Sequence, residues 1–325
     1  LSLSAVIILG STGQSLGAVI PCDGMHLVAT ERYSAAEECF KTALETNPED
    51  ANIHASLSKL HIAQGNTKKG VEHAKKATSL ASTNADHWIL LAIAYMERLE
   101  DVSIFSKASM AKKIRNSLNK AIDLDPENAQ AHYLLAQYYI EAPALVGGGI
   151  DKAEKQITIL QRLDPARAER ARVDVAEQKD DLEMVEKHLL EAIKLDSSPA
   201  SRYEYGVFLW TRAQRFENAV EVFAAGIASH PEYSENYYQL GRAILAFVDV
   251  PSKPQIEAGI DAIKHFISMP HSEWRDPLLY KWAHYRLGML YGLAGEKSNE
   301  IDHYQKALKL DPDFAEVKKA LAEVQ

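Results

Sequence analysis

Histidine, aspartate and glutamate are the residue types in this chain that could carry out acid–base or metal chemistry. The sequence of 325 residues contains 12 histidines. A helical zinc site of the metalloprotease type needs two histidines four residues apart on one helix, and the sequence contains no such pair. The neighbouring carboxylates Glu37 and Glu38, like Asp180 and Asp181, would point in different directions from a helix, which indicates solvated charge. These patterns predict no metal site and no catalytic carboxylate pair.

A phosphate-binding loop is also not indicated. The glycine run from Gly147 to Gly149 follows no strand pattern and matches neither G-x-G-x-x-G nor the G-K-[ST] phosphate loop. Without a phosphate loop, a metal ligand set or an acid–base pair, the sequence predicts no cofactor and no enzyme activity.

The composition is that of a globular protein. Hydrophobic residues make up 46% of the chain and charged residues 25%. The formal net charge is -9, with an isoelectric point near 5.8. Nucleic-acid phosphates require clustered lysine and arginine, so this acidic chain is not expected to bind nucleic acid. No apolar run approaches the about 20 residues that a transmembrane helix needs.

The N-terminal segment differs from the rest of the chain. Residues Leu1 to Ile20 carry no charge, and their apolar core has the length of a signal-peptide core. Ser15 and Gly17 are small residues spaced like a cleavage signal. We therefore expect a signal peptide over residues 1–17, and the alternative is a buried N-terminal segment.

Helix stop signals recur along the chain. Proline cannot continue a helix and pushes the preceding residue towards extended geometry. Such prolines follow an amphipathic helical pattern at Pro48, Pro126, Pro165, Pro231, Pro270 and Pro312. Together with the amphipathic spacing they predict helix pairs over residues 17–50, 51–84, 85–128, 129–165, 166–199, 200–233, 234–271 and 281–314. The second of these pairs has Ser82 where proline is expected. A linker from Ser272 to Tyr280 precedes the last pair, and residues 315–325 are expected to form a terminal helix.

The stretch from Trp282 to Phe314 carries a family resemblance. Counted from Lys281, it holds Leu287, Gly288, Tyr291, Tyr304, Ala307 and Pro312 at characteristic positions. This pattern resembles the 34-residue tetratricopeptide repeat, or TPR, which is a helix pair. The resemblance implies an all-α fold over residues 18–325: a right-handed α-solenoid of about eight stacked helix pairs with a C-terminal capping helix.

The resemblance also assigns positions to residues that could otherwise be read as functional. His54, His61, His132 and His284 fall at positions that normally hold bulky packing residues, so we expect them to be structural. Cys22 and Cys39 fall on the two helices of the first pair, where they could meet. The alternatives for these cysteines are a disulfide and two small buried hydrophobic residues.

TPR proteins bind partners mainly in a concave groove, which is lined by particular positions on the first helix of each repeat. The resemblance therefore implies a binding site in the later repeats. Its predicted residues are Tyr133, Gln137, Arg167, Arg170, Phe208, Tyr238, Arg242, Trp282, Tyr285 and Met289. Arginine and aromatic residues are typical of binding hot spots. On an acidic chain, arginines in a groove favour a protein or peptide partner that carries carboxylates. The alternative is that the aromatic residues pack against the next repeat.

Two insertions predict a second contact surface. They lie between the two helices of consecutive pairs, after Arg98 and after Glu141, and should emerge at one edge. Their apolar residues Ile104, Phe105, Leu145 and Val146 would form a lip for a partner or pack locally. The second insertion, A-P-A-L-V-G-G-G, resembles a loop of exported bacterial TPR proteins.

The function predicted from the sequence is that of a non-catalytic scaffold that binds partner segments in its groove. With the expected signal peptide, the location would be periplasmic or secreted at a bacterial envelope; without it, cytoplasmic. One alternative is an envelope assembly or chaperone-like factor, and another is a TPR subunit that presents a glycan or an enzyme substrate. A homo-oligomer is compatible with each function.

Overall fold

A computed structural model describes residues 23–29, 32–247, 251–269 and 277–324. Within these ranges the chain forms 17 α-helices and one 3-10 helix, and no β-strand occurs there. The predicted all-α fold of stacked helix pairs with a terminal helix is confirmed. The expected signal peptide and Cys22 lie outside the described residues, so the prediction of export stays untested.

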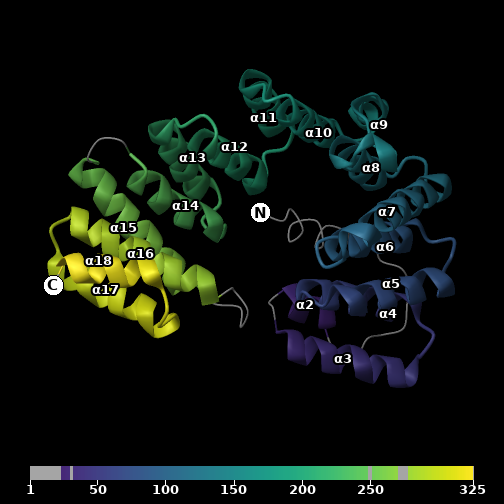
Figure 1. Cartoon of the computed structure of the whole chain (residues 1–325), viewed down its shortest axis with the longest axis horizontal. Helices are drawn as coiled ribbons and strands as arrows, with labels where there is room; N and C mark the ends of the chain where they lie inside the picture. Colours follow the sequence, from purple (N-terminus) through teal and green to yellow (C-terminus); the bar gives the residue numbers. More distant parts are fainter. Residues whose placement is uncertain (1–22, 30–31, 248–250, 270–276, 325) are drawn as a thin grey trace. The chain divides into compact units, whose positions relative to one another are not determined.

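The helices group into two compact units, Leu1–Lys179 and Asp180–Gln325 (Figure 1). The sequence predicted one array, and the boundary between the units falls inside its fifth helix pair. The first helix of that pair buries mainly alanines, Ala168 and Ala171 among them, and these pack into a core shared with the two preceding helices. Each unit is described by itself below.

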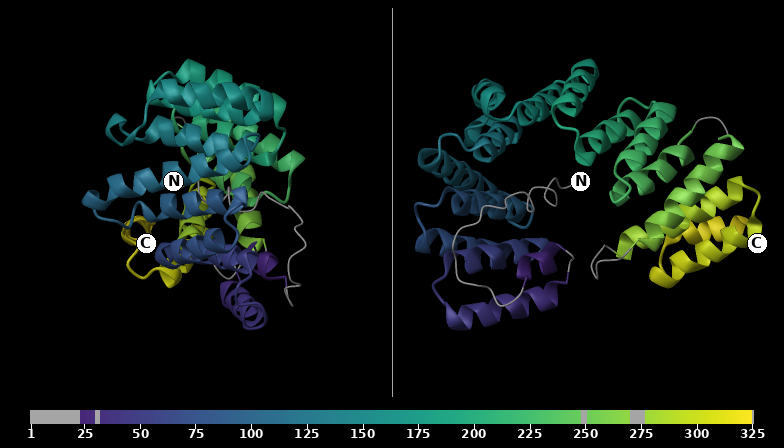
Figure 2. Two further views of the ribbon diagram at one scale, coloured as in Figure 1. Left: turned by 90° about the vertical axis from the view of Figure 1, so that its right-hand side faces the viewer. Right: turned by 180° about the vertical axis from the view of Figure 1, so that it is seen from behind.

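The N-terminal unit consists of successive helices that lie side by side in each view (Figures 1 and 2). Its elements are α2 (Gly24–Ala29), α3 (Tyr33–Thr46), α4 (Ala51–Ala63), α5 (Thr67–Leu80), α6 (Ala85–Arg98), α7 (Ile104–Leu124), α8 (Ala129–Glu141), the 3-10 helix η1 (Ala144–Val146), α9 (Ile150–Leu163) and α10 (Pro165–Gln178). Helices α4 and α5, α6 and α7, and α8 and α9 form the predicted pairs.

Side-chain caps fix where several of these helices begin. The carboxylate of Asp50 accepts hydrogen bonds from the backbone N–H groups of Asn52 and Ile53 at the start of α4. Asn84 and Asn128 cap α6 and α8 in the same way. A cap of this kind stabilises a helix by about 1 kcal/mol because it satisfies backbone donors that have no partner inside the helix.

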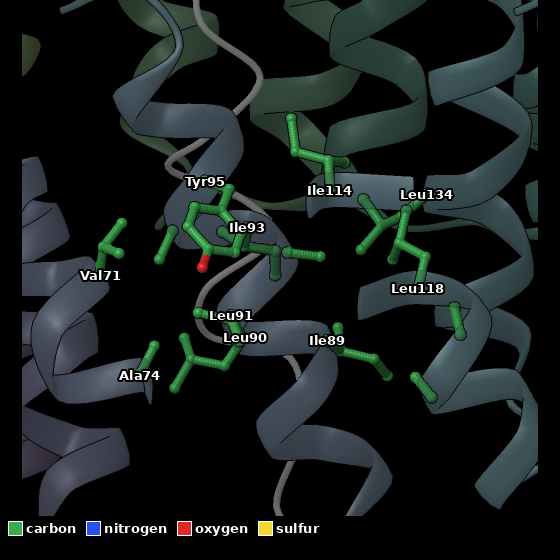
Figure 3. Packing of buried hydrophobic residues seen from close by; sticks show 14 of the residues in the cluster. Val71, Ala74, Ile89, Leu90, Leu91, Ile93, Tyr95, Ile114, Leu118 and Leu134 are labelled. Carbon is green, nitrogen blue, oxygen red and sulfur yellow. The ribbon is translucent and has the colours of Figure 1, made fainter. Parts of the chain in front are cut away.

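The largest core of the N-terminal unit lies around α6 (Figure 3). Ile93 of α6, Ile114 and Leu118 of α7 and Leu134 of α8 converge there, and each is at most 8% exposed. Fully buried alanines such as Ala92 separate these larger side chains and let the helices approach closely. Burial of each large side chain stabilises the fold by roughly 1.5–3 kcal/mol.

The C-terminal unit repeats the same arrangement. Its helices are α11 (Leu182–Leu195), α12 (Pro199–Thr211), α13 (Phe216–Ser229), α14 (Ser234–Leu245), α15 (Lys253–Ser268), α16 (Pro277–Leu293), α17 (Lys297–Leu310) and α18 (Ala315–Val324). Helix α18 is the predicted terminal helix. Helix α16 begins at Pro277, so the predicted linker to Tyr280 is shorter than expected; proline with its fixed φ is well suited to the first turn of a helix.

Two further observations concern the described residues. None of their helices combines the length and the apolar character of a membrane span. No cluster of their histidine, cysteine, aspartate or glutamate side chains has the arrangement of a metal site.

Candidate functional site

Arginine and aromatic side chains alternate across α12, α14 and α16 of the C-terminal unit, each the first helix of a pair. The guanidinium of Arg242 lies 4.1 Å from the ring centroid of Trp210 and 5.8 Å from that of Tyr238. The guanidinium of Arg286 lies 5.1 Å from the centroids of both Tyr238 and Trp282. We call these five residues the arginine–aromatic row. In such stacks each cation is attracted to the negative face of its ring.

Helical spacing builds the arginine–aromatic row. Tyr238 and Arg242 are four residues apart on α14, and Trp282 and Arg286 are four residues apart on α16. Residues at this spacing lie one turn apart on the same face of a helix. Helix α14 packs against both α12 and α16, so these faces adjoin and Trp210 of α12 completes the row.

The two guanidinium groups are held by neutral partners. Arg242 donates to the side-chain oxygen of Gln239 at 3.0 Å, and Arg286 donates to the hydroxyl of Tyr238. Among the described residues, no carboxylate lies within salt-bridge distance of either arginine. Burial lowers the pKa of both arginines, because each charge has lost part of its hydration. The site therefore has two partly desolvated positive charges, and no carboxylate of the described residues neutralises them.

Hydrogen bonds to the row hold its side chains in place. Gln239, which accepts from Arg242, donates through its amide to the Tyr203 hydroxyl at 3.0 Å. The buried indole N–H of Trp210 has no hydrogen-bond partner within the part of the chain that the structure describes. The row thus combines two cations held in place with the Trp210 N–H, a donor that has no acceptor among the described residues.

Three of the predicted groove residues in this unit lie outside the row. Phe208 is 6% exposed, and its ring stacks on Tyr205 at 6.5 Å. Tyr285 contacts Phe314 at a centroid distance of 5.5 Å, and Met289 packs in the same terminal cluster against α18. These three side chains contact neither arginine of the row. Tyr238 and Trp282 also pack on the protein, with ring centroids 5.1 Å from Phe266 and 4.5 Å from Phe314, but each stacks with an arginine as well. Tyr238, Arg242 and Trp282 are brought together.

In the N-terminal unit the predicted groove residues are engaged with one another or with their own helix. The amide of Gln137 donates to the Tyr133 hydroxyl at 3.1 Å. Arg167 forms a salt bridge of 3.4 Å with Asp164, the residue that caps α10. Arg170 is half-buried on α10. Because Arg167 already has a carboxylate partner, this face offers less to an anionic ligand than the arginine–aromatic row does.

Arg286 and Trp210 were missed by the sequence analysis. Arg286 does not fall at a position that the repeat pattern assigns to the groove, and Trp210 lies in the last turn of α12. A signal for Arg286 was present, because Trp282 and Arg286 repeat the aromatic-x-x-x-Arg spacing of Tyr238 and Arg242. The contact of both arginines with the same Tyr238 ring needed the tertiary structure.

The apolar residues of the two insertions have different surroundings. Ile104 and Phe105 form the first turn of α7 rather than a loop, and they are 78% and 93% exposed. Leu145 of η1 is 95% exposed. Val146 packs on the core, and its carbonyl accepts from the Tyr138 hydroxyl at 2.7 Å. Local packing therefore accounts for Val146, whereas the other three side chains are open.

Cys39 of α3 is 7% exposed, and its sulfur lies 3.0 Å from where a Cβ atom on Gly24 would stand. The Cys22–Cys39 disulfide remains a prediction, because Cys22 lies outside the described residues. Peptide mass mapping of the unreduced protein would test it: a linked peptide pair supports the disulfide, and two alkylated cysteines contradict it.

Comparison with known proteins agrees with this architecture. Models of the tetratricopeptide repeat match residues 24–85 and residues 283–314. The crystal structure of yeast Tom70 is similar over 91% of this chain and 58% of that chain, with 18% identity and a TM-score of 0.60. No curated protein sequence matches the chain.

Two further solved structures are similar over most of the chain. The crystal structure of the APC/C hetero-tetramer Cut9-Hcn1 has 16% identity and a TM-score of 0.49, over 93% of this chain and 54% of that chain. A tetratricopeptide repeat protein from Parabacteroides merdae ATCC 43184 has 15% identity and a TM-score of 0.40, over 93% and 95%. This chain thus spans little more than half of Cut9-Hcn1 and Tom70. The similarity to Tom70, at 18% identity, shows the fold alone. The matched repeats and the stacked helix pairs identify the chain as a member of the tetratricopeptide repeat family.

Proposed function

We propose that this protein is a non-catalytic interaction scaffold whose C-terminal unit binds an acidic peptide segment of a partner protein across α12, α14 and α16. The observation that carries the proposal is the pair Arg242 and Arg286, two half-buried guanidinium groups stacked on aromatic rings with no carboxylate partner among the described residues. A tetratricopeptide fold supports protein binding in general, and this pair narrows the chemistry of the bound segment.

A peptide carboxylate meets the requirements of the arginine–aromatic row. Guanidinium binds carboxylate through two parallel N–H···O bonds, and each charge-assisted hydrogen bond contributes about 1.5–3 kcal/mol. The attraction is strengthened because both arginines have already lost part of their hydration in the folded protein. The rings hold the guanidinium planes in place, so little side-chain entropy is lost on binding.

Sugar binding is a poorer fit to the same residues. A glycan would stack on an open aromatic face, but the Arg242 guanidinium lies 4.1 Å above Trp210 and the Arg286 guanidinium lies 5.1 Å above Trp282. A sugar ring would have to displace a cation from its ring. The row therefore favours an anionic ligand over a neutral glycan.

Fluorescence anisotropy with labelled synthetic peptides tests the proposal. The probe is a short peptide rich in aspartate and glutamate, and the comparison peptide has asparagine and glutamine at the same places. We expect saturable binding of the acidic peptide to the full chain and a loss of about tenfold or more in affinity in Arg242→Gln and in Arg286→Gln, since each removes a charge-assisted contact.

Arg202→Gln is the matched control. Arg202 lies on the same helix as Trp210, but its guanidinium donates to the exposed Ser229 hydroxyl at 2.9 Å and takes no part in the row. The proposal is wrong if the control weakens binding as much as Arg242→Gln does, because general charge would then explain the affinity. Equal binding of the acidic and amide peptides would also contradict it.

A further inference from the structure

The N-terminal unit contains a cavity of about 630 Å³ that the proposed function does not use. It lies between α6, α7, α8 and η1. Its inner wall includes Ile93, Ile114 and Leu134, which Figure 3 shows converging from three different helices. A volume of this size holds one or two large side chains, and its lining is mainly apolar.

Carboxylates line the cavity alongside these apolar residues. Glu97, Glu100 and Glu141 all contribute to its lining, and Lys107 is the one lining residue with a positive charge. Lys107 lies 3.7 Å from Glu100 and therefore offsets that carboxylate. Neither Glu97 nor Glu141 has a salt-bridge partner among the described residues. The lining thus has a net negative charge beside an apolar surface.

Glu141 is partly enclosed by protein at the cavity wall. Its side chain is exposed to solvent, yet desolvation by the surrounding protein raises its pKa. Both can hold for a carboxylate on the wall of a cavity, where protein surrounds the group while water still reaches it. A cation placed beside Glu141 would restore the lost hydration energy.

Exposed apolar side chains are concentrated beside this cavity. Ile104, Phe105 and Leu145 are 78%, 93% and 95% exposed, whereas the other exposed large apolar residues in the described ranges reach at most 48%. Leu145 is itself part of the lining. Ile104 lies one turn before Ala108, which lines the cavity from α7, so the apolar wall continues outwards along that helix. Such a concentration is typical of an interaction surface.

The glycine run from Gly147 to Gly149, in the second insertion, fixes the backbone that forms the outer wall of the cavity. Gly147 and Gly149 have φ of 99° and 139°, which side-chain-bearing residues rarely adopt. A Cβ atom on Gly148 would lie 1.7 Å from the carbonyl oxygen of Ala142. The carbonyl of Val146 accepts from Tyr138 and from Arg115, which joins η1 to α8 and α7. The wall is therefore formed before any ligand binds.

We propose that this cavity is a second binding site, which takes a basic amphipathic segment of a partner protein. An apolar side chain of that segment enters between Ile114, Leu134 and Leu145, and a lysine or arginine beside it pairs with Glu97 or Glu141. Charge complementarity and the exposed apolar residues of the rim favour this occupant. The inference does not depend on the proposed function, because it concerns other residues and a ligand of opposite charge.

A pair of helical peptides tests the preference of the cavity for a basic amphipathic segment. The probe is a fluorescein-labelled peptide with a face of leucines flanked by lysines, and its binding to the full chain is measured by anisotropy. We expect saturable binding that weakens about tenfold or more when the lysines are replaced by glutamate or the leucines by alanine. Failure of the leucine–lysine peptide to saturate, or equal binding of all three peptides, would overturn the proposal.

Variants then locate the site. Ala108→Trp fills the mouth of the cavity from an exposed position of α7, so the fold should tolerate it while binding of the leucine–lysine peptide is lost. The double variant Glu97→Gln with Glu141→Gln should also bind the peptide more weakly. Its control is Glu154→Gln with Glu257→Gln, which changes the net charge equally at exposed positions outside the cavity. Equal losses in the two double variants, or unchanged binding in Ala108→Trp, would contradict the assignment.

Photocrosslinking gives a readout that does not depend on folding of a variant. A benzoylphenylalanine replaces the central leucine of the probe, and the attached residue in the wild-type protein is found by mass spectrometry. Attachment at Met96 or Leu145, both in the lining, supports the site. Attachment only elsewhere overturns it. Self-association of the protein that Ala108→Trp abolishes would also overturn it, in favour of a second copy of this chain as occupant.

Discussion

Single residues determine the charge of the two proposed binding surfaces. Arg242 and Arg286 have neutral hydrogen-bond partners, and burial lowers the pKa of each. In the cavity, Glu97 and Glu141 likewise have no cation within salt-bridge distance among the described residues. Exposed salt bridges such as Lys253–Glu257 contribute little to stability. Partly desolvated charges without an opposite charge beside them are therefore better indicators of a ligand than the net charge of the protein.

The shape of the guanidinium group matters as much as its charge. Arg286→Lys keeps the positive charge but removes the planar fork that stacks on two rings and can bind a carboxylate through two bonds. We expect the acidic peptide to bind with about 1–2 kcal/mol less free energy, measured by isothermal titration calorimetry. Unchanged affinity would show that a positive charge at position 286 is enough for binding and that the planar guanidinium is not needed. Thermal unfolding of the variant serves as the control for folding.

We expect two histidine pairs to make the free energy of unfolding depend on pH. The Nδ1 atoms of His54 and His73 lie 3.0 Å apart, and so do those of His284 and His303. Desolvation, followed by the neighbouring imidazoles, lowers the pKa of His73 to about 4, and desolvation with His303 lowers that of His284 to about 4. The folded pairs are therefore neutral at pH 7, and one ring in each pair donates to the other.

The direction of this pH effect follows from proton binding. Between pH 6.5 and about 4 the unfolded chain binds protons at these histidines that the folded chain does not, so unfolding becomes easier as the pH falls through this window. After allowance for solvent screening, the loss is on the order of 1–2 kcal/mol for each pair. Urea unfolding at pH 7 and pH 5 measures it. His73→Gln and His284→Gln should each reduce the difference, and an unchanged difference in both variants would contradict the prediction.

At the scale of elements, the close approach of paired helices is set by small residues. A Cβ atom on Gly206 of α12 would lie 2.5 Å from the ring of Phe223 on α13. A Cβ atom on Gly288 of α16 would lie 2.5 Å from the ring of Tyr304 on α17. Each glycine lies directly against a large, buried ring of the partner helix. The distance between the helices of a pair, and with it the position of the arginine–aromatic row, depends on these contacts.

Gly288→Ala and Gly292→Ala separate crowding from helix propensity on one helix. The new methyl at position 288 meets the buried ring of Tyr304, which cannot move away, so we expect destabilisation by about 1–3 kcal/mol. At position 292 it meets only the carboxylate of Glu300, the end of a flexible side chain. There the gain in helix propensity, up to about 1 kcal/mol, should offset the contact. Chemical denaturation measures both, and equal effects would mean that crowding is not the cause.

At the scale of the whole molecule, the two proposed binding sites differ in charge and belong to different compact units. The arginine–aromatic row lies within residues 180–325, and the carboxylate-lined cavity lies within residues 1–179. None of the helices in the described ranges contributes to both. The proposed scaffold function therefore predicts that two different partner segments can be held at once.

Simultaneous binding follows from that separation. We expect the acidic peptide and the leucine–lysine peptide to bind one full-length chain together, each with the affinity it shows alone, because their contact residues belong to different units. Titration of one peptide in the presence of saturating amounts of the other measures this. Mixing the two peptides without protein provides the control for direct pairing of their charges. Mutual exclusion would mean that both bind at one place.

The sequence by itself determined the all-α fold, the succession of helix pairs and the helix faces on which Tyr238, Arg242 and Trp282 lie. These features follow from local rules: the 3.6-residue period, proline stops and small residues at close approaches act within a few turns of helix. The two insertions occupy equivalent places in consecutive helix pairs, and from this the sequence predicted that they emerge at one edge. In the structure, residues of both insertions line one cavity.

Only the tertiary structure decided which of these side chains stack with the two arginines. Phe208 and Tyr238 are buried to the same extent, yet only the Tyr238 ring contacts Arg242 and Arg286. Arg286 joins the site because α14 brings Tyr238 beside it, a contact across 48 residues of sequence. The cavity likewise requires three helices and η1 to meet. Local periodicity fixes the direction of a side chain from its own helix, but exposure and charge pairing depend on the neighbouring helices, whose packing is set by every side chain in the interface.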